Sequence, residues 1–425
     1  MDIQFARIDL LGKELNYVQS VLESGWLTTA GKTLMFEEKF ARAVEAQFAC
    51  AVNSCTAALH LGLEALGVEA GDRVLVPTMT FTSSAEVVRY LGADPVFVDV
   101  AYETRIVTPK AVKKALEEDD RIKAVIVVHF GGQAAPLLDK NGEDGILSIC
   151  KRHGVKLVED AAHAFPAYCV QQDLSHLDEK PLRPNGSSGY VKEQMLDREK
   201  YLNSRIKWLP VGSIGDVTCF SFYANKTITT GEGGMLATND ANVAERVRMM
   251  RLHGINRDVW NRYTGSTADW EYDVAAPGFK YNMPDINAAI GLAQLERAEE
   301  MRKARQRVAE FYIERLSNLE YIDIPRINGP FEYHAWHLFC IVLKPESPVS
   351  RNEFIEKMAK AGIGTSVHYK PLHRMTYYQK RYKLKPESFP NAERIWQGTV
   401  SLPIYPGLTE EEMEYVVKTI HSILY

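Results

Sequence analysis

The chain has 425 residues, 50 of them basic and 55 acidic, so its formal net charge is −5. Because no basic tract stands out, this balance argues against a nucleic-acid-binding surface. Hydrophobic residues make up 46% of the chain and charged residues 25%, as in a soluble globular protein with a core large enough to enclose a ligand. The first residues lack a signal-peptide pattern and no apolar run is long enough to span a bilayer, so we expect a cytoplasmic protein without membrane contact.

The six cysteines contain no C-x-x-C pair. This spacing argues against a zinc ribbon, a thioredoxin-like centre or another metal site. Cys50 and Cys55 stand in apolar surroundings and are interpreted as small buried hydrophobic residues.

Short β-branched runs alternate with helical patterns through the first half of the chain. Residues 73–77, 94–100, 124–130 and 155–160 are continuously apolar, as expected for parallel strands that are covered on both faces. The segments SSAEVVRYLG, PKAVKKALEE and ILSICKRHG between them have helical periodicity. This order predicts an α/β fold with a mainly parallel sheet.

The second half of the chain departs from this alternation. Residues 216–222 and 233–240 are expected to add strands to the same sheet, whereas residues 166–212 form an insertion that is partly loop. One long helix is predicted over residues 284–316, and the remainder is typical of a smaller α+β domain. We therefore expect a large domain over residues 1–260 and a connecting helix with a small domain over residues 261–425.

Several polar residues fall at the carboxyl ends of predicted strands, where open α/β sheets bind ligands. Asp160 ends one strand, Lys226 follows another, and Ser54 with Thr56 begins a helix. Taken singly, an acid here is more often a helix cap, a lysine a solvated charge, and serine or threonine a cap. Together they supply a carboxylate, an amine and a phosphate cradle at one sheet edge, the set that pyridoxal phosphate requires.

These residues carry a family resemblance. The chain resembles the DegT/DnrJ/EryC1/StrS sugar aminotransferases, a branch of the fold-type-I, aspartate aminotransferase-like enzymes. The resemblance runs through nearly the whole chain and rests on motifs in the family order: SGWLTTAGKTLMFEEKFA, NSCTAALHLGL, GDRVLVPTMTFTSSAEVV, EDAAHAF, FSFYANKTITTGEGG, GFKYNMPDINAAIGLAQL and GIGTSVHYKPLH. It implies a large domain with a seven-stranded, mainly parallel sheet between helices, and a small C-terminal domain.

The resemblance implies three catalytic residues. Lys226 would hold pyridoxal phosphate as a Schiff base and then act as the general base that moves the proton. Asp160 would keep the pyridine nitrogen protonated, and the cationic ring would in turn keep this buried carboxylate charged. His163 would lie near the phenolic oxygen of the cofactor, although a buried core histidine is the alternative.

Further cofactor contacts follow from the same resemblance. Phe81 would stack on the pyridine ring, while the backbones of Thr56 and Ala57 and the hydroxyl of Ser221 would hold the phosphate. Asn282 corresponds to a residue that the partner subunit gives to this phosphate, or else it is a solvated loop asparagine. The resemblance therefore implies a homodimer with shared active sites.

The lysine at position 226, in place of the histidine found in dehydrating relatives, implies transamination. L-Glutamate would donate the amino group and leave as 2-oxoglutarate, and a nucleotide-linked keto-sugar would accept it in a ping-pong scheme. GIGTSVHYKPLH is most similar to enzymes that aminate C4 of a UDP-linked keto-sugar, which makes His368 and Tyr369 candidate sugar contacts.

Alternatives within the enzyme class are a 3-keto sugar nucleotide or a keto-cyclitol as acceptor. Outside that class, the chain would be a catalytically silent regulator that binds pyridoxal phosphate or a sugar nucleotide, or a dinucleotide-dependent enzyme. Lys226, Asp160 and His163 are all present, which argues against a silent site. A first strand followed by G-x-G-x-x-G is absent, which argues against a dinucleotide site.

Overall fold

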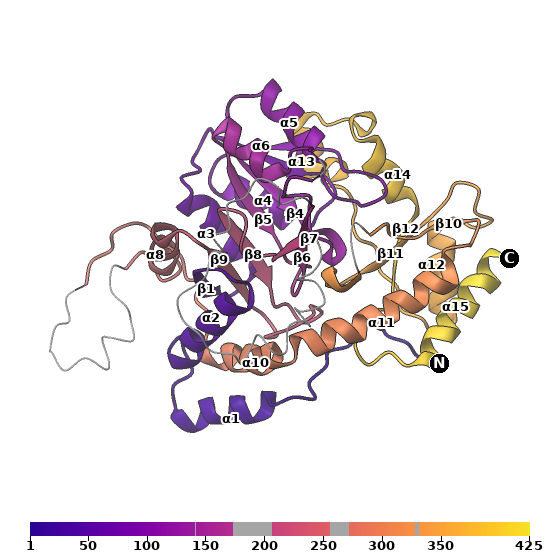
Figure 1. Ribbon diagram of the computed structural model, residues 1–425, viewed down its shortest axis with the longest axis horizontal. Helices are drawn as coiled ribbons and strands as arrows, with labels where there is room; N and C mark the ends of the chain where they lie inside the picture. Colours follow the sequence, from indigo (N-terminus) through magenta and orange to yellow (C-terminus); the bar gives the residue numbers. More distant parts are fainter. Residues whose placement is uncertain (141, 173–205, 256–271, 328–330) are drawn as a thin grey trace.

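The computed structural model describes residues 1–140, 142–172, 206–255, 272–327 and 331–425 (Figure 1). Most of the predicted insertion over residues 166–212 and the predicted domain boundary at residue 260 lie outside the described residues. The division into two domains therefore stays a prediction.

Within the described residues, a mixed sheet forms the centre of the molecule. Its strands are β1 (Phe48–Val52), β2 (Arg73–Pro77), β3 (Asp94–Val98), β4 (Ile122–Val128), β5 (Lys156–Asp160), β8 (Val217–Ser221) and β9 (Gly234–Thr238). They follow the order β1-β9-β8-β5-β4-β2-β3. Only β9 runs against its two neighbours, so the other strands share one direction. The predicted α/β fold with a seven-stranded, mainly parallel sheet is confirmed.

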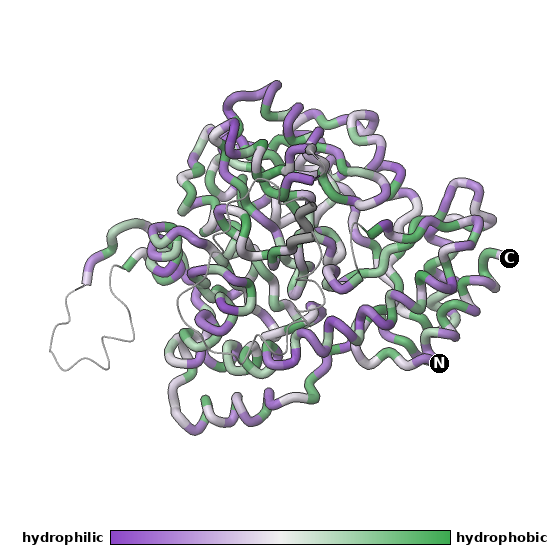
Figure 2. The backbone as a smooth tube through the Cα atoms, in the orientation of Figure 1, coloured by the Kyte–Doolittle hydropathy of each residue, from purple (hydrophilic) through white to green (hydrophobic). Residues whose placement is uncertain are grey.

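Helices cover both faces of this sheet (Figure 1). They are α2 (Gly31–Ala43), α3 (Cys55–Ala65), α4 (Ser83–Tyr90), α5 (Pro109–Glu118), α6 (Ile146–His153), α8 (Ala241–Met250), α10 (Asp285–Glu296) and α11 (Ala298–Leu316). The helix α1 (Glu14–Ser24) packs on the outside of α10. Side chains of β4 alternate between the two cores: Ala124 and Ile126 face α3, α4 and α8, whereas Val125 and Val127 face α2, α5 and α6. This double burial explains the unbroken apolar runs, and the hydrophobic stretches of the chain gather along these strands (Figure 2).

A second α+β unit follows the sheet along the chain. It contains β10 (Ile322–Asp323), β11 (Phe339–Leu343), β12 (Thr399–Leu402), α12 (Arg351–Lys360), α13 (Thr376–Tyr382), α14 (Pro390–Gly398) and α15 (Glu410–Leu424). The second half of α11 packs into the hydrophobic core of this second unit, so this helix connects the two units. Ile3 also pairs with Ile363, which places the N-terminus beside this unit (Figure 1).

The structure corrects two details of the sequence prediction and adds one. The helix expected over residues 284–316 is broken into α10 and α11 at Arg297, whose φ of −114° and ψ of 7° leave the helical region. The edge strand β1 was not predicted. The two ends of the insertion, β6 (Tyr168–Gln172) and β7 (Ile206–Pro210), pair with each other as antiparallel strands. Residues 173–205 between them lie outside the described part.

The six cysteines are buried free thiols, in agreement with the interpretation of Cys50 and Cys55. No helix in the described part of the chain is long and apolar enough to cross a membrane.

One carboxylate ties α2 to α10. Asp285 accepts hydrogen bonds from the backbone N–H groups of Ala30, Lys32 and Thr33 at 2.8, 3.0 and 2.9 Å, and from the Thr33 hydroxyl at 2.7 Å. Asp285 is 4% exposed, so water does not replace these bonds easily. The carboxylate also complements the positive end of the α2 dipole.

We therefore predict that Asp285→Ala lowers the free energy of unfolding by about 3 kcal/mol, because several buried N–H donors lose their acceptor. Asp240→Ala is the matched control, since Asp240 is exposed and caps α8 through a single bond of 2.8 Å to the Asn242 N–H. This change should cost only about 1 kcal/mol. Urea unfolding of both variants checks the prediction, and equal losses would contradict it.

Candidate active site

The carboxyl ends of the parallel strands bring the predicted residues to one edge of the sheet. Asp160 ends β5, Ser221 ends β8, and Ser54 follows β1 as the N-cap of α3. Lys226 lies in the turn after β8, where its backbone N–H donates to the Tyr223 carbonyl at 2.9 Å. The parallel direction of the strands thus gathers an acid, an amine and a helix N-terminus.

Asp160 is 4% exposed, and both of its oxygens are held by the chain. The Ser84 hydroxyl donates to Oδ2 at 2.7 Å, and the Ala162 N–H donates to Oδ1 at 3.2 Å. Burial raises the pKa of Asp160, while these two hydrogen bonds and the charge of Lys226 oppose the rise. The carboxylate is therefore oriented, and a nearby cation would favour its charged form.

Lys226 is an unusual lysine. Burial lowers the pKa of its amine to about 8, more than the opposing charge of Asp160 raises it, and Arg305 lowers it further. The amine lies 3.4 Å from Nε2 of His337. A larger fraction of this amine than of an exposed lysine is therefore the free base at neutral pH, as a nucleophile or general base requires.

His163 has a defined tautomer. Its Nδ1 accepts the Gly131 N–H at 3.3 Å, so the ring proton lies on Nε2, which is 2.9 Å from the Tyr369 hydroxyl oxygen. Burial and the charge of Lys226 lower the pKa of His163 well below its usual range, and burial raises the pKa of Tyr369. Both groups are therefore neutral, and Tyr369 keeps its own proton available for an acceptor.

Phe81, expected to stack on the cofactor ring, and His368, expected to contact the sugar, lie beside Tyr369. The Phe81 ring is 6.0 Å from that of Tyr369, and 56% of Phe81 is exposed. His368 hydrogen-bonds through Nδ1 to the Ser401 hydroxyl at 2.7 Å, and burial lowers its pKa to about 4. The two residues of the GIGTSVHY segment thus differ: Tyr369 contacts His163, whereas His368 is anchored to β12.

The N-terminus of α3 has the form of an anion site. Gly234 packs so closely there that a Cβ on it would lie 2.4 Å from the Ser54 carbonyl carbon. The Ser54 hydroxyl accepts the Ala57 N–H at 3.1 Å, so this predicted phosphate donor is already used as a cap. The N–H groups of Cys55 and Thr56 precede the first helical hydrogen bond, from Ala58 to Ser54, and can meet an anion.

Asn282 is not joined to the Lys226 group by any hydrogen bond among the described residues. Its amide donates to the Thr29 hydroxyl of the same chain at 2.6 Å, and its backbone forms a bridge with Val52 at the end of β1. The contribution of this residue to a partner's site stays a prediction.

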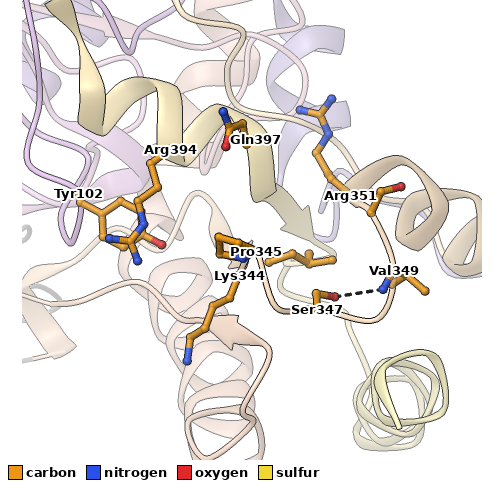
Figure 3. A pocket seen from close by; sticks show the side chains of 10 residues that line it. Tyr102, Lys344, Pro345, Ser347, Val349, Arg351, Arg394 and Gln397 are labelled. Carbon is orange, nitrogen blue, oxygen red and sulfur yellow. Dashed lines mark hydrogen bonds between the residues drawn. The ribbon is translucent and has the colours of Figure 1, made fainter. Parts of the chain in front are cut away.

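A cleft of about 360 Å³ lies apart from these residues, between the end of β11, the start of α12 and α14 (Figure 3). It contains none of the predicted site residues. Its lining is formed by Tyr102, Leu343, Lys344, Pro345, Ser347, Val349, Ser350, Arg351, Arg394 and Gln397. Within the described residues, no cluster of histidine, cysteine or acidic side chains has the form of a metal site.

Sequence analysis missed two supports of the site. Ser84 holds Asp160, and His129 at the end of β4 bonds through Nε2 to the buried Glu159 carboxylate at 2.8 Å. Glu159 also accepts the Gly215 N–H at 2.6 Å and the Thr218 hydroxyl at 2.9 Å, which braces β5 below Asp160. The available signal for His129 was a polar residue within the otherwise apolar predicted strand 124–130.

The chain is similar to known proteins over nearly its whole length. The pattern of the DegT/DnrJ/EryC1/StrS aminotransferase family matches residues 9–421. The chain is 38% identical over 425 residues to the spore coat polysaccharide biosynthesis protein SpsC of Bacillus subtilis, covering 98% of this chain and 96% of SpsC. The present chain belongs to the DegT/DnrJ/EryC1/StrS family.

Solved structures of sugar aminotransferases have the same fold. The putative sugar aminotransferase Spr1654 from Streptococcus pneumoniae, in its PMP form, gives a TM-score of 0.81 at 27% identity and covers 100% of this chain and 98% of its own. The aminotransferase TlmJ from Streptoalloteichus hindustanus gives 0.79 at 29% identity and covers 99% and 98%. As a member of the family, the chain is a fold-type-I transaminase that depends on pyridoxal phosphate.

The residues present fit this cofactor. Pyridoxal phosphate needs an amine, an acid and an anion site, and the structure supplies a low-pKa Lys226, an oriented Asp160 and the α3 N-terminus. Two buried polar atoms near Lys226, Oδ1 of Asn225 and Nδ1 of His337, have no hydrogen-bond partner within the described part of the chain. Both atoms are able to form hydrogen bonds with a bound cofactor or substrate.

The lowered pKa of Lys226 gives a stability prediction for the cofactor-free chain. Below the folded pKa of about 8, Lys226 is charged in both states, and the folded chain bears the full cost of a partly buried ammonium. Between pH 8 and the ordinary lysine pKa of 10.5, the unfolded chain binds more protons than the folded chain, so the free energy of unfolding rises with pH. Lys226→Met should therefore stabilise the chain by about 2 kcal/mol at pH 7, and this gain should shrink as the pH approaches 10.5.

Urea unfolding at pH 7 and pH 10 measures this difference. The exposed Lys418 on α15 gives the matched control Lys418→Met, which should change stability little at either pH. A Lys226→Met chain no more stable than the wild type at pH 7 would show that the amine is not penalised by its surroundings.

Proposed function

We propose that this transaminase transfers the amino group of L-glutamate to a nucleotide-linked keto-sugar, at C4 of a UDP-linked 4-keto sugar, through a shared site of a homodimer. The observation that carries the proposal is the half-buried Lys226 amine, which faces the neutral imidazole of His337 at the sheet edge where Asp160 ends its strand. The kinship with SpsC, whose name assigns it to polysaccharide biosynthesis, supports a sugar acceptor.

Lys226 would attach the cofactor and, once released, move a proton between the substrate carbon and the C4′ carbon of the cofactor. When bound, pyridoxal phosphate supplies the electron sink that allows the bond to this proton to break. An amine with a pKa of about 8 is well matched to both tasks, because it accepts a proton near neutral pH and gives it back.

Asp160 would hold the proton on the ring nitrogen, since Ser84 and Ala162 fix its oxygens and a cationic partner offsets its burial. The N–H groups of Cys55 and Thr56 and the hydroxyl of Ser221 would bind the phosphate. Phe81 would cover the ring face.

Tyr369 would donate its hydroxyl proton to an oxygen of the substrate or the cofactor. The Nε2–H group of His163 donates a hydrogen bond to the Tyr369 hydroxyl oxygen, so the hydroxyl proton of Tyr369 is available for another acceptor. The predicted contact of His163 with the phenolic oxygen would thus pass to Tyr369, because both nitrogens of His163 already have partners.

The amino-donor half is tested by the visible spectrum of the holoenzyme. L-Glutamate should convert the yellow protein to the colourless amine form of the cofactor, whereas Lys226→Ala should lose this conversion by at least about 10³-fold. Lys418→Ala should behave as the wild type. If only another amino acid converts the protein, that amino acid replaces L-glutamate as the proposed donor. A chain that never acquires colour with pyridoxal phosphate would contradict the assigned cofactor residues.

The acceptor half is tested with Tyr369→Phe and a panel of three acceptors: a UDP-linked 4-keto sugar, a 3-keto sugar nucleotide and a keto-cyclitol. We expect the first to be preferred, and the variant to lower kcat/KM for it by about 30-fold, because a buried hydrogen bond is lost. Tyr377→Phe, at an exposed position, should be silent. Preference for another acceptor would overturn the C4 assignment.

A further inference from the structure

The segment of residues 334–338, HAWHL, is fixed against the loop that also holds His163. The Ala335 N–H donates to the Gly132 carbonyl at 2.9 Å, and the Leu338 N–H donates to the Gly131 carbonyl at 3.0 Å. Gly132 has a φ of +107°, and a Cβ there would lie 2.9 Å from the Trp336 nitrogen. The close approach gives the segment a defined position relative to the sheet edge.

His337 is the residue of this segment that reaches the site. It is 4% exposed, and its ring lies 4.5 Å from that of His163. Its Nε2 is 3.4 Å from the Lys226 amine, and its buried Nδ1 has no hydrogen-bond partner among the described residues. Among the described residues, no carboxylate forms an ion pair with the Lys226 amine. His337 is therefore the acceptor that faces this amine.

The groups around His337 keep it neutral. Burial lowers its pKa well below the usual range, and the charges of Lys226 and Arg305 and the rings of His163 and His368 act in the same direction. The Asp160 carboxylate acts on the pKa of Lys226 instead. A neutral imidazole that meets an ammonium must accept through Nε2, so the ring proton lies on Nδ1.

We propose that His337 is a positioning residue that holds the Lys226 amine through Nε2 whenever this amine is not attached to the cofactor. The proposal rests on the role of Lys226 given above. Four rotatable bonds separate the amine from the backbone, so an acceptor is needed to aim it. A carboxylate in this place would raise the pKa of the amine, whereas a neutral ring orients it and leaves it able to lose its proton.

The test follows the capture of pyridoxal phosphate by the cofactor-free chain, by absorbance, as a function of pH. His337→Gln keeps an acceptor near the position of Nε2, and His337→Leu removes it. We expect the capture rate of the wild type to rise to a plateau with a midpoint near pH 8. His337→Leu should lower the plateau about tenfold or more, and His337→Gln should stay within about threefold of the wild type.

Binding of pyridoxamine phosphate, which requires no reaction with Lys226, reports the integrity of the site and should be unchanged in both variants. His334→Gln is the matched control, because His334 is a buried histidine of the same segment whose Nδ1 accepts the Trp336 N–H at 2.8 Å. It should capture the cofactor at the wild-type rate.

Three results would overturn the proposal: His337→Leu as fast as the wild type, His337→Gln as slow as His337→Leu, or loss of pyridoxamine phosphate binding in His337→Gln. Capture requires no amino donor. A wild-type chain that captures the cofactor but is inert to every donor would therefore defeat the proposed function and leave the role of His337 standing. Capture by Lys226→Ala at the wild-type rate would defeat both.

Discussion

The common direction of the parallel strands is the constraint on which the site depends. Because β2, β4, β5 and β8 end at the same edge, residues that are far apart in the chain meet there without long connecting loops. Asp160 and Lys226 come from neighbouring strands, and Tyr369 reaches His163 across 206 positions of sequence. The buried faces of the sheet supply the rigidity that keeps these groups in place.

The electrostatics of the site follow from the burial of Lys226. Among the described residues, the amine contacts the His337 imidazole and forms no ion pair, while Asp160 is engaged by Ser84 and Ala162. Burial therefore depresses the pKa of the lysine without a compensating ion pair. The chain accepts a cost in stability at this position, which is typical of sites that require a reactive amine.

Much of the fold and of the candidate site could be predicted, because unbroken apolar strands and the polar residues that follow them are local signals. The strand Phe48–Val52 escaped prediction, since its sequence FACAV is rich in small residues and the strand is held by pairing with β9, 182 to 190 positions further along the chain. The break at Arg297 was missed because apolar periodicity continues across it. The contacts of His337 and Ser84 could not be predicted, because they depend on tertiary packing.

The attachment of the cofactor to Lys226 is the central claim, and its most direct measurement is chemical. The holoenzyme is reduced with borohydride, digested, and the peptides are weighed by mass spectrometry. The account predicts the mass of the reduced cofactor on the peptide that contains Lys226 and on no other lysine. A label on a different lysine, or a holoenzyme whose cofactor is released entirely after reduction, would contradict it.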